Sequence, residues 1–63
     1  MEKRYSILKE ISLSSPIGRR MLAGKLNLSE RVVRTEVEFL KEQNLINIDA
    51  SGMFMTDEGI DVL

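Results

Sequence analysis

The 63-residue sequence predicts a mainly α, α+β domain: a winged helix-turn-helix with a three-helix core, a two-stranded β-hairpin wing and the start of a C-terminal helix. Three observations lead to this prediction. Apolar residues recur at helical spacing in three successive segments, a short turn separates the second from the third, and two short apolar runs around a glycine-containing turn follow. Because a chain of this length can bury only one compact core, residues 1–63 are interpreted as a single domain.

The first predicted helix covers residues 2–13. Its apolar stripe consists of Tyr5, Leu8 and Ile11, with Ile7 beside them. Pro16 disfavours the helical conformation for Ser15, so the helix is expected to end there. Ile17 is then expected to be an apolar plug in an extended connection.

The second predicted helix covers residues 19–25 and follows Gly18. We expect its buried side to be Leu22, Ala23 and Leu26. Asn27-Leu28-Ser29 predicts a tight turn, because Asn tolerates left-handed backbone angles and Leu28 offers an inward anchor.

The third predicted helix begins after Ser29, a good N-cap, and runs to about Gln43. Its buried stripe is Val33, Val37 and Leu40. Asn44 is expected to end this helix in a left-handed conformation.

The predicted wing consists of the runs 45–49 and 53–55 around a turn at 50–52. Phe54, Ile46 and Ile48 are expected to face inward, and Met21, Met53 and Met55 are interpreted as core filler together with Phe54. Thr56 predicts the N-terminus of a last helix, which has barely two turns before Leu63, as in an excised fragment.

The composition argues against an enzyme. The sequence has no histidine and no cysteine, so the usual general base, metal ligands and disulfides are missing. The acidic pairs 36/38 and 57/58 lack metal-site spacing and are expected to be solvated surface, so we predict no catalytic residue, metal or cofactor in this fragment. No apolar run approaches the roughly 20 residues of a membrane span, and the N-terminus lacks a signal-peptide core, which favours a cytoplasmic location.

Charge is divided unevenly along the chain. Residues 1–34 contain eight basic and three acidic residues, a net charge of +5, whereas residues 35–63 contain one basic and seven acidic residues, a net charge of −6. Because association with phosphate depends on the local field, the N-terminal half is a candidate surface for nucleic acid.

The candidate DNA-reading residues lie at the start of the third helix, on the side opposite the Val33 stripe. They are Ser29, Glu30, Arg31, Arg34 and Thr35. Helix-turn-helix domains read the major groove with this part of the second motif helix, where arginine pairs with guanine and a carboxylate accepts from cytosine. The alternative is a solvated surface with an ion pair such as Glu30–Arg34.

Two further segments are candidate DNA contacts. Arg19 and Arg20, at the start of the second helix, are expected to lie near the DNA backbone. The wing tip, residues 49–52, has no Lys or Arg, so a wing contact would use Ser51 or the Gly52 backbone.

Residues 16–23 (Pro-Ile-Gly-Arg-Arg-Met-Leu-Ala), 28–34 (Leu-Ser-Glu-Arg-Val-Val-Arg) and 37–45 resemble the N-terminal DNA-binding domain of the central glycolytic gene repressors. These are bacterial SorC-type sugar-binding transcriptional regulators. The resemblance implies that residues 29–35 read an operator and that Arg19 and Arg20 lie near its backbone. It also implies a larger C-terminal domain, absent here, that binds a phosphorylated sugar such as fructose 1,6-bisphosphate, and a homo-oligomeric full-length protein.

The sequence therefore predicts an operator-binding domain of a bacterial transcriptional repressor, with duplex DNA as its partner and no role for a membrane. A protein–protein interaction winged helix that does not bind DNA is the alternative. The acidic second half of the chain and the acidic wing motivate this alternative.

Overall fold

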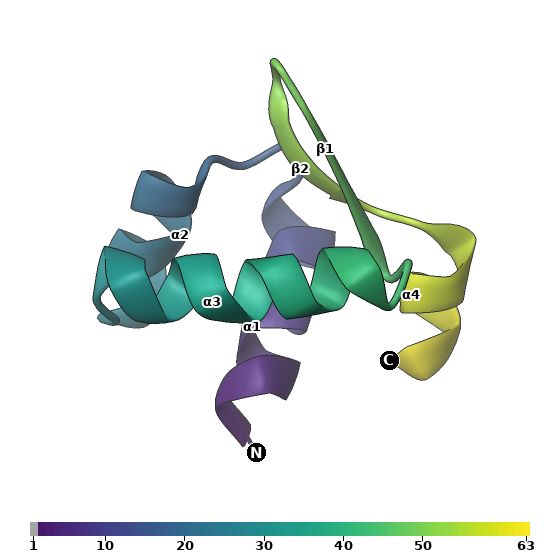
Figure 1. The fold of residues 1–63 in the computed structure, drawn as a ribbon, viewed down its shortest axis with the longest axis horizontal. Helices are drawn as coiled ribbons and strands as arrows, with labels where there is room; N and C mark the ends of the chain where they lie inside the picture. The colour runs from purple at the N-terminus through teal and green to yellow at the C-terminus, as the bar shows by residue number, and fades with distance from the viewer. Residues whose placement is uncertain (1) are drawn as a thin grey trace.

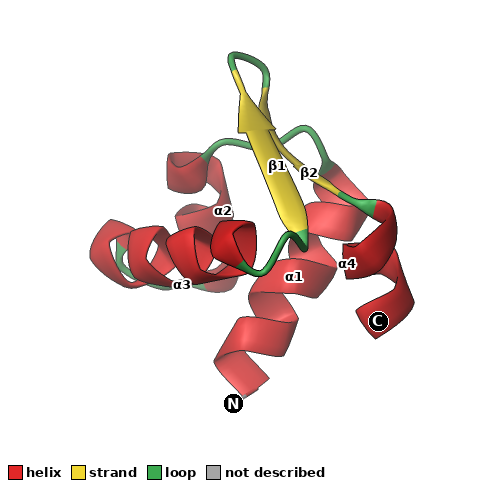
Figure 2. Ribbon diagram, turned by 45° about the vertical axis from the view of Figure 1, so that its right-hand side comes forward, coloured by secondary structure: helices red, strands yellow, loops and turns green. Residues whose placement is uncertain are grey.

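A computed structural model describes residues 2–63 and has helices on one side and a hairpin that rises from them (Figures 1 and 2). In chain order the elements are α1 (Glu2–Ser14), α2 (Arg19–Leu26), α3 (Glu30–Glu42), β1 (Ile46–Asp49), β2 (Gly52–Met55) and α4 (Asp57–Val62). The predicted order of elements is confirmed, and each helix boundary lies within one residue of its prediction.

The core lies between α1, α2, α3 and the hairpin. The three helices contact one another, β1 packs on α3, and β2 packs on α1. The buried apolar side chains are Ile7, Leu8, Ile11, Ile17, Leu22, Ala23, Val33, Val37, Leu40, Ile46 and Met53. Burying a side chain of Val, Leu or Ile size contributes roughly 1.5–3 kcal/mol, so this one cluster holds both the helices and the hairpin in place.

The turn between α2 and α3 has the predicted conformation. Asn27 is left-handed, with φ of 58°, and the Leu28 amide donates to the Ala23 carbonyl over 2.9 Å. The Ser29 hydroxyl accepts a hydrogen bond from the Val32 amide at 3.1 Å, which confirms it as the N-cap of α3. These local hydrogen bonds fix the conformation of the turn and so the direction of α3 relative to α2.

The hairpin differs from the prediction in two ways. Gly52 is not part of the turn but begins β2, opposite Asp49. The register pairs Ile46 with Met55 and Ile48 with Met53, so these four residues share the face that packs on the helices. Phe54 is opposite Asn47 on the other face, so the prediction that Phe54 points inward and fills the core is wrong. Met53, with 1% of its surface exposed, takes the buried position.

Two helical residues are also more exposed than predicted. Met21 is 64% exposed, because α2 buries only Leu22 and Ala23 and Met21 is turned about 100° away from Leu22. Tyr5 is 48% exposed near the N-terminal end of α1, and Ile7 is the first fully buried residue of this helix. The interpretation of Met21 as core filler is therefore wrong, and Tyr5 belongs to the helical apolar stripe of α1 without being buried.

Ile17 is buried and extended, as predicted, and it also pairs with the wing. Its amide donates to the Met53 carbonyl at 3.2 Å, and the Met53 amide donates to the Ile17 carbonyl at 2.8 Å. The segment before α2 thus adds a single antiparallel bridge to β2. It couples the position of the wing to the start of α2.

The C-terminal turn is held by polar contacts. Asn44 is left-handed, with φ of 63°, as predicted. The Thr56 side chain caps α4 by accepting from the Gly59 amide at 3.0 Å and donates to the Asn44 carbonyl at 2.7 Å.

Within residues 2–63, no helix combines the length and apolar character needed to cross a membrane.

Candidate nucleic-acid interface

The first residues of α2 and α3 present their side chains to one another. Arg20 Nε lies 3.4 Å from Glu30 Oε2, and the two side chains are 91% and 55% exposed. Among the residues that the structure describes, Glu30 therefore pairs with Arg20 of the neighbouring helix and not with Arg34 of its own. The contact brings the two arginine-containing segments predicted from the sequence onto one surface.

The exposed face of α3 is as predicted. Arg31, Arg34 and Thr35 are exposed, whereas Val33 and Val37 are fully buried on the other side. The Thr35 hydroxyl donates to the Arg31 carbonyl at 3.1 Å. Because that proton is used within the helix, Thr35 offers its methyl group and hydroxyl lone pairs to a ligand.

The N-terminus of α2 carries no side-chain cap. Gly18 occupies the N-cap position in an extended conformation, and no acidic residue lies in the first turn. Arg19 and Arg20 are exposed beside this positive helix end. Free backbone amides next to two guanidinium groups favour an anion such as a DNA phosphate.

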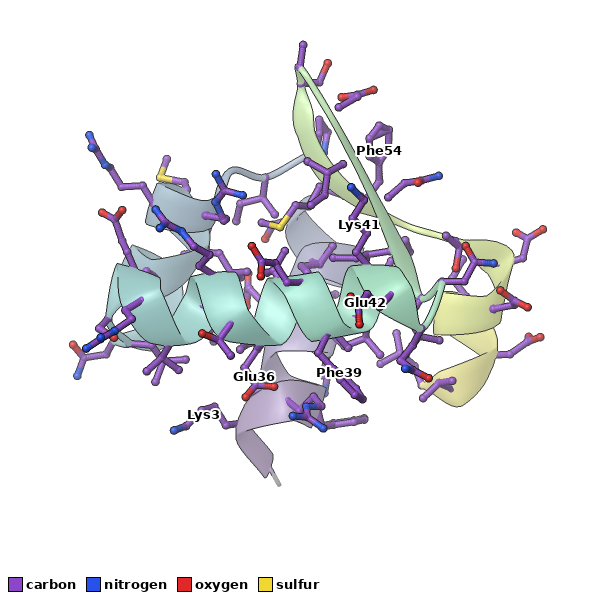
Figure 3. All side chains as sticks on the ribbon, in the orientation of Figure 1. Lys3, Glu36, Phe39, Lys41, Glu42 and Phe54 are labelled. Atoms are coloured by element: carbon purple, nitrogen blue, oxygen red, sulfur yellow. The ribbon has the colours of Figure 1, made fainter. Side chains whose placement is uncertain are left out.

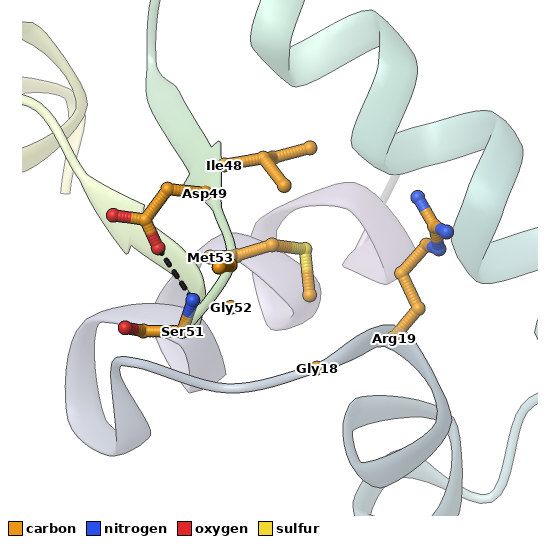
Figure 4. A pocket seen from close by; sticks show the side chains of 8 residues that line it. Gly18, Arg19, Ile48, Asp49, Ser51, Gly52 and Met53 are labelled. Carbon is orange, nitrogen blue, oxygen red and sulfur yellow. Dashed lines mark hydrogen bonds between the residues drawn. The ribbon is translucent and has the colours of Figure 1, made fainter.

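The wing tip lies beside the start of α2. Asp49, Ser51 and Gly52 line a small hollow together with Gly18 and Arg19 (Figure 4). Asp49 Oδ1 accepts from the Ser51 amide at 2.7 Å, shown as a dashed line in Figure 4. Since the Ser51 amide already donates this hydrogen bond, Ser51 can offer only its hydroxyl to a partner.

Gly52 has a structural reason to be glycine. Its φ is +130°, and an added Cβ would lie 2.9 Å from the backbone of Ile17. Gly52 is therefore needed for the close approach of β2 to the segment before α2.

The second half of α3 is acidic on its exposed side. Glu38, Lys41 and Glu42 line an open hollow there. Figure 3 shows Lys41 on the side of α3 that carries the wing and Glu42 projecting outward. Apart from Lys41, the basic residues of α2 and α3 therefore lie on α2 and in the first two turns of α3.

Arg4 makes two contacts that were not predicted from the sequence. Its Nε donates to Glu36 Oε1 at 2.5 Å, and its guanidinium carbon lies 3.9 Å from the centre of the Phe39 ring. Glu36 is therefore half-buried and paired, not solvated as predicted. No sequence spacing indicates this pair, because 32 residues separate its members.

Across residues 2–63, no three His, Cys, Asp or Glu side chains gather where they could hold a metal ion. The polar groups of α2, α3 and the wing lie on open surface, where they can meet a large ligand.

The helix–turn–helix of α2 and α3, together with a hairpin that packs against it, defines a winged helix-turn-helix domain. The family model described as "CggR N-terminal DNA binding domain" matches residues 1–63. The chain therefore belongs to this family of DNA-binding domains.

Two relatives agree with this assignment, and one solved structure shares the fold. The chain is 56% identical over 63 residues to the central glycolytic genes regulator of Bacillus subtilis (strain 168) and 63% identical over 59 residues to that of Priestia megaterium (strain DSM 319 / IMG 1521). These alignments cover 100% and 94% of this chain but only 18% and 17% of the relatives. The activation domain of the phage T4 transcription factor MotA shares the fold, with a TM-score of 0.89 over 98% of this chain and 66% of that one, at 24% identity.

Proposed function

We propose that the domain binds an operator by placing the N-terminal half of α3 in the major groove. Arg31 and Arg34 read base edges there, and Glu30 accepts from cytosine or restrains Arg20. Arg19 and Arg20 hold the phosphate backbone. The observation that carries this proposal is the contact between Arg20 and Glu30, which unites the two arginine-containing helix starts on one exposed surface.

The distribution of acidic residues supports a tilted orientation of α3. Glu38 and Glu42 are exposed on the same side as Arg31, about two and three turns further along the helix. Carboxylates close to phosphates are repelled, so the C-terminal half of α3 leaves the groove. The wing adds a minor contact through the Ser51 hydroxyl or the Gly52 backbone.

The role of the longer protein is also a proposal, because the chain spans less than one-fifth of the relatives it matches. We infer a cytoplasmic, homo-oligomeric repressor of glycolytic genes, in which this domain has no cofactor and no catalytic activity. A phosphorylated sugar such as fructose 1,6-bisphosphate would control it through a part outside these 63 residues. The family and the relatives' name as glycolytic gene regulators support this inference.

An amide NMR titration of the ¹⁵N-labelled domain with an arbitrary duplex, at low and moderate salt, tests the interface. Non-specific affinities of about 10⁻⁴–10⁻⁶ M are within its range. We expect shifts at residues 18–20 and 29–35 that weaken as salt rises, because counterion release drives phosphate binding. Shifts confined to α4, or no shift at either salt, would contradict the proposal and favour a protein partner.

A further inference from the structure

The side of α3 that lies away from the wing has no basic residue of its own. Figures 1 and 2 both place the wing and the start of α2 above α3, and the N-terminus of α1 below it. Helical spacing puts four residues of α3 on this lower flank: Val32, Thr35, Glu36 and Phe39. The one charged side chain among these four is the carboxylate of Glu36. On its own, the lower flank of α3 would therefore repel a phosphate.

A helix that lies in the major groove has a DNA backbone along each of its flanks. The groove is about 12 Å wide, and an α-helix with its side chains is roughly 10–12 Å in diameter. Arg19 lines a hollow together with the wing tip, so Arg19 and Arg20 lie above α3 and can hold one of the two backbones. The second backbone, below α3, then has no phosphate contact from the residues assigned so far.

Arg4 neutralises the lower flank and holds α1 against it. Its Nε donates to Glu36 Oε1 at 2.5 Å, and its guanidinium carbon lies 3.9 Å from the centre of the Phe39 ring. The Glu36 side chain is only 19% exposed, so its carboxylate is shielded as well as paired. Because both contacts are made to the same flank of α3, they fix the first turn of α1 beside it.

Lys3 is the basic residue that this arrangement brings to the lower flank. It precedes Arg4 in the first turn of α1 and is exposed. Figure 3 shows Lys3 below α3, pointing away from Phe39 and toward the end of α3 that begins at Glu30. The first turn of α1 thus places an ammonium group on the side of the reading residues that Arg19 and Arg20 do not cover.

We propose that Lys3 holds a phosphate of the second DNA backbone, and that Arg4 and Glu36 are positioning residues for Lys3. With Lys3 below α3 and Arg19 and Arg20 above it, phosphate contacts lie on both sides of the groove and set the angle at which α3 enters. Phosphate contacts fix orientation without reading sequence, so Lys3 acts alike on all duplexes. This inference rests on the proposed insertion of α3 and extends the interface to α1.

Salt titrations of binding to an arbitrary duplex, followed by fluorescence anisotropy, test the role of Lys3. Lys3→Gln should weaken binding several-fold at low salt and reduce the salt slope by about 1, because one phosphate contact is lost. Lys9→Gln is the matched control. It makes the same charge change at an exposed residue of α1 that lies about 120° around the helix axis from Lys3, so it should leave the slope nearly unchanged. Equal effects of the two variants would overturn the proposal.

Glu36→Ala tests the positioning role of Arg4. This substitution removes a negative charge, so charge alone would strengthen DNA binding and leave the cost of Lys3→Gln as it is in the wild type. Positioning predicts instead that Lys3→Gln costs less than about twofold in the Glu36→Ala background, because the first turn of α1 is released. A cost as large as in the wild type would overturn the positioning role. Circular dichroism establishes that each variant is folded.

The same titrations separate the role of Lys3 from DNA binding itself. A wild-type domain that binds the duplex at no salt concentration would overturn both the proposed function and the role of Lys3. A salt slope that falls in Arg19→Ala but not in Lys3→Gln would overturn the role of Lys3 alone.

Discussion

Arg20 and Glu30 form an ion pair across the turn that joins α2 to α3, with Arg20 Nε 3.4 Å from Glu30 Oε2. Both side chains are largely exposed, so the pair adds at most about 1 kcal/mol to stability. The pair matters more for the charge of the proposed interface than for stability. The carboxylate of Glu30 offsets one of the four arginine charges that the proposed interface offers to DNA.

Replacing Glu30 with Gln should therefore strengthen binding to an arbitrary duplex several-fold, because a negative charge is removed from a surface that faces phosphates. Fluorescence anisotropy with a labelled duplex at two salt concentrations measures the change, which should shrink at higher salt. Glu38→Gln is the matched control, since Glu38 lies further along α3. Equal gains in both variants would argue against a tilted α3.

The arginines of α3 and α2 should differ in what they contribute. Arg31→Ala and Arg34→Ala are expected to lose about 1–3 kcal/mol of operator binding at any position where a base is read directly. Arg19→Ala should weaken binding similarly for all sequences and reduce the salt slope by about 1, because it removes a phosphate contact. Lys9→Ala serves as the control, because Lys9 is an exposed basic residue of α1 outside the proposed interface. An Arg19 variant that changed sequence preference would contradict the assigned roles.

The Ser29 cap should matter for stability as well as for the interface. Ser29→Ala leaves the Val32 amide without its side-chain acceptor, at a cost of about 0.5–2 kcal/mol. In a domain of this size, each kcal/mol corresponds to a fall in Tm of roughly 4–8 °C. Thermal unfolding followed by circular dichroism measures the change, and Ser29→Asp, which can still cap the helix, should unfold close to the wild type.

The parts of the fold that follow from local sequence were predicted well. Val33, Val37 and Leu40 lie on one side of a helix because of their spacing alone. Asn27 and Asn44 adopt left-handed backbone angles that few other residues tolerate. The order of elements is therefore readable from short segments.

The register of the wing could not be predicted in the same way. The run Met53-Phe54-Met55 is apolar on both faces of a strand, so alternation does not indicate which face is buried. The choice depends on Ile17, whose backbone bonds to Met53 fix the inward face and require Gly52 at the point of closest approach. A contact between segments 36 residues apart has no local signal.

In the candidate site, too, features set by local sequence were predicted and a feature set by packing between helices was not. The exposure of Arg31 and Arg34 follows from the α3 stripe, and Arg19 and Arg20 follow from their place at a helix start. The pairing of Glu30 with Arg20 depends on how α2 packs against α3, so the sequence indicated only the intrahelical partner, Arg34.

Adjacent residues of β2 should respond very differently to truncation. Met53→Ala removes a fully buried side chain and should cost about 2–5 kcal/mol. Phe54→Ala removes a larger but half-exposed side chain outside the core, so its cost should be smaller, roughly 1 kcal/mol. Urea unfolding of the two variants measures both values. A Phe54 variant less stable than the Met53 variant would mean that the register is reversed.

Two helical glycines should give opposite results when replaced by Ala. Gly59 of α4 is buried, and an added Cβ would lie 2.0 Å from the Leu45 carbonyl oxygen, so α4 would have to move away from the end of α3. We expect Gly59→Ala to cost about 1–3 kcal/mol. Gly24 of α2 has no atom within 4 Å of its added Cβ, so Gly24→Ala should stabilise the domain by about 0.5–1 kcal/mol through helix propensity alone. Chemical unfolding measures both changes, and ¹H–¹⁵N spectra of the Gly59 variant should shift mainly around Leu45 and α4. A Gly59 variant as stable as the Gly24 variant would show that α4 does not pack against Leu45 in solution.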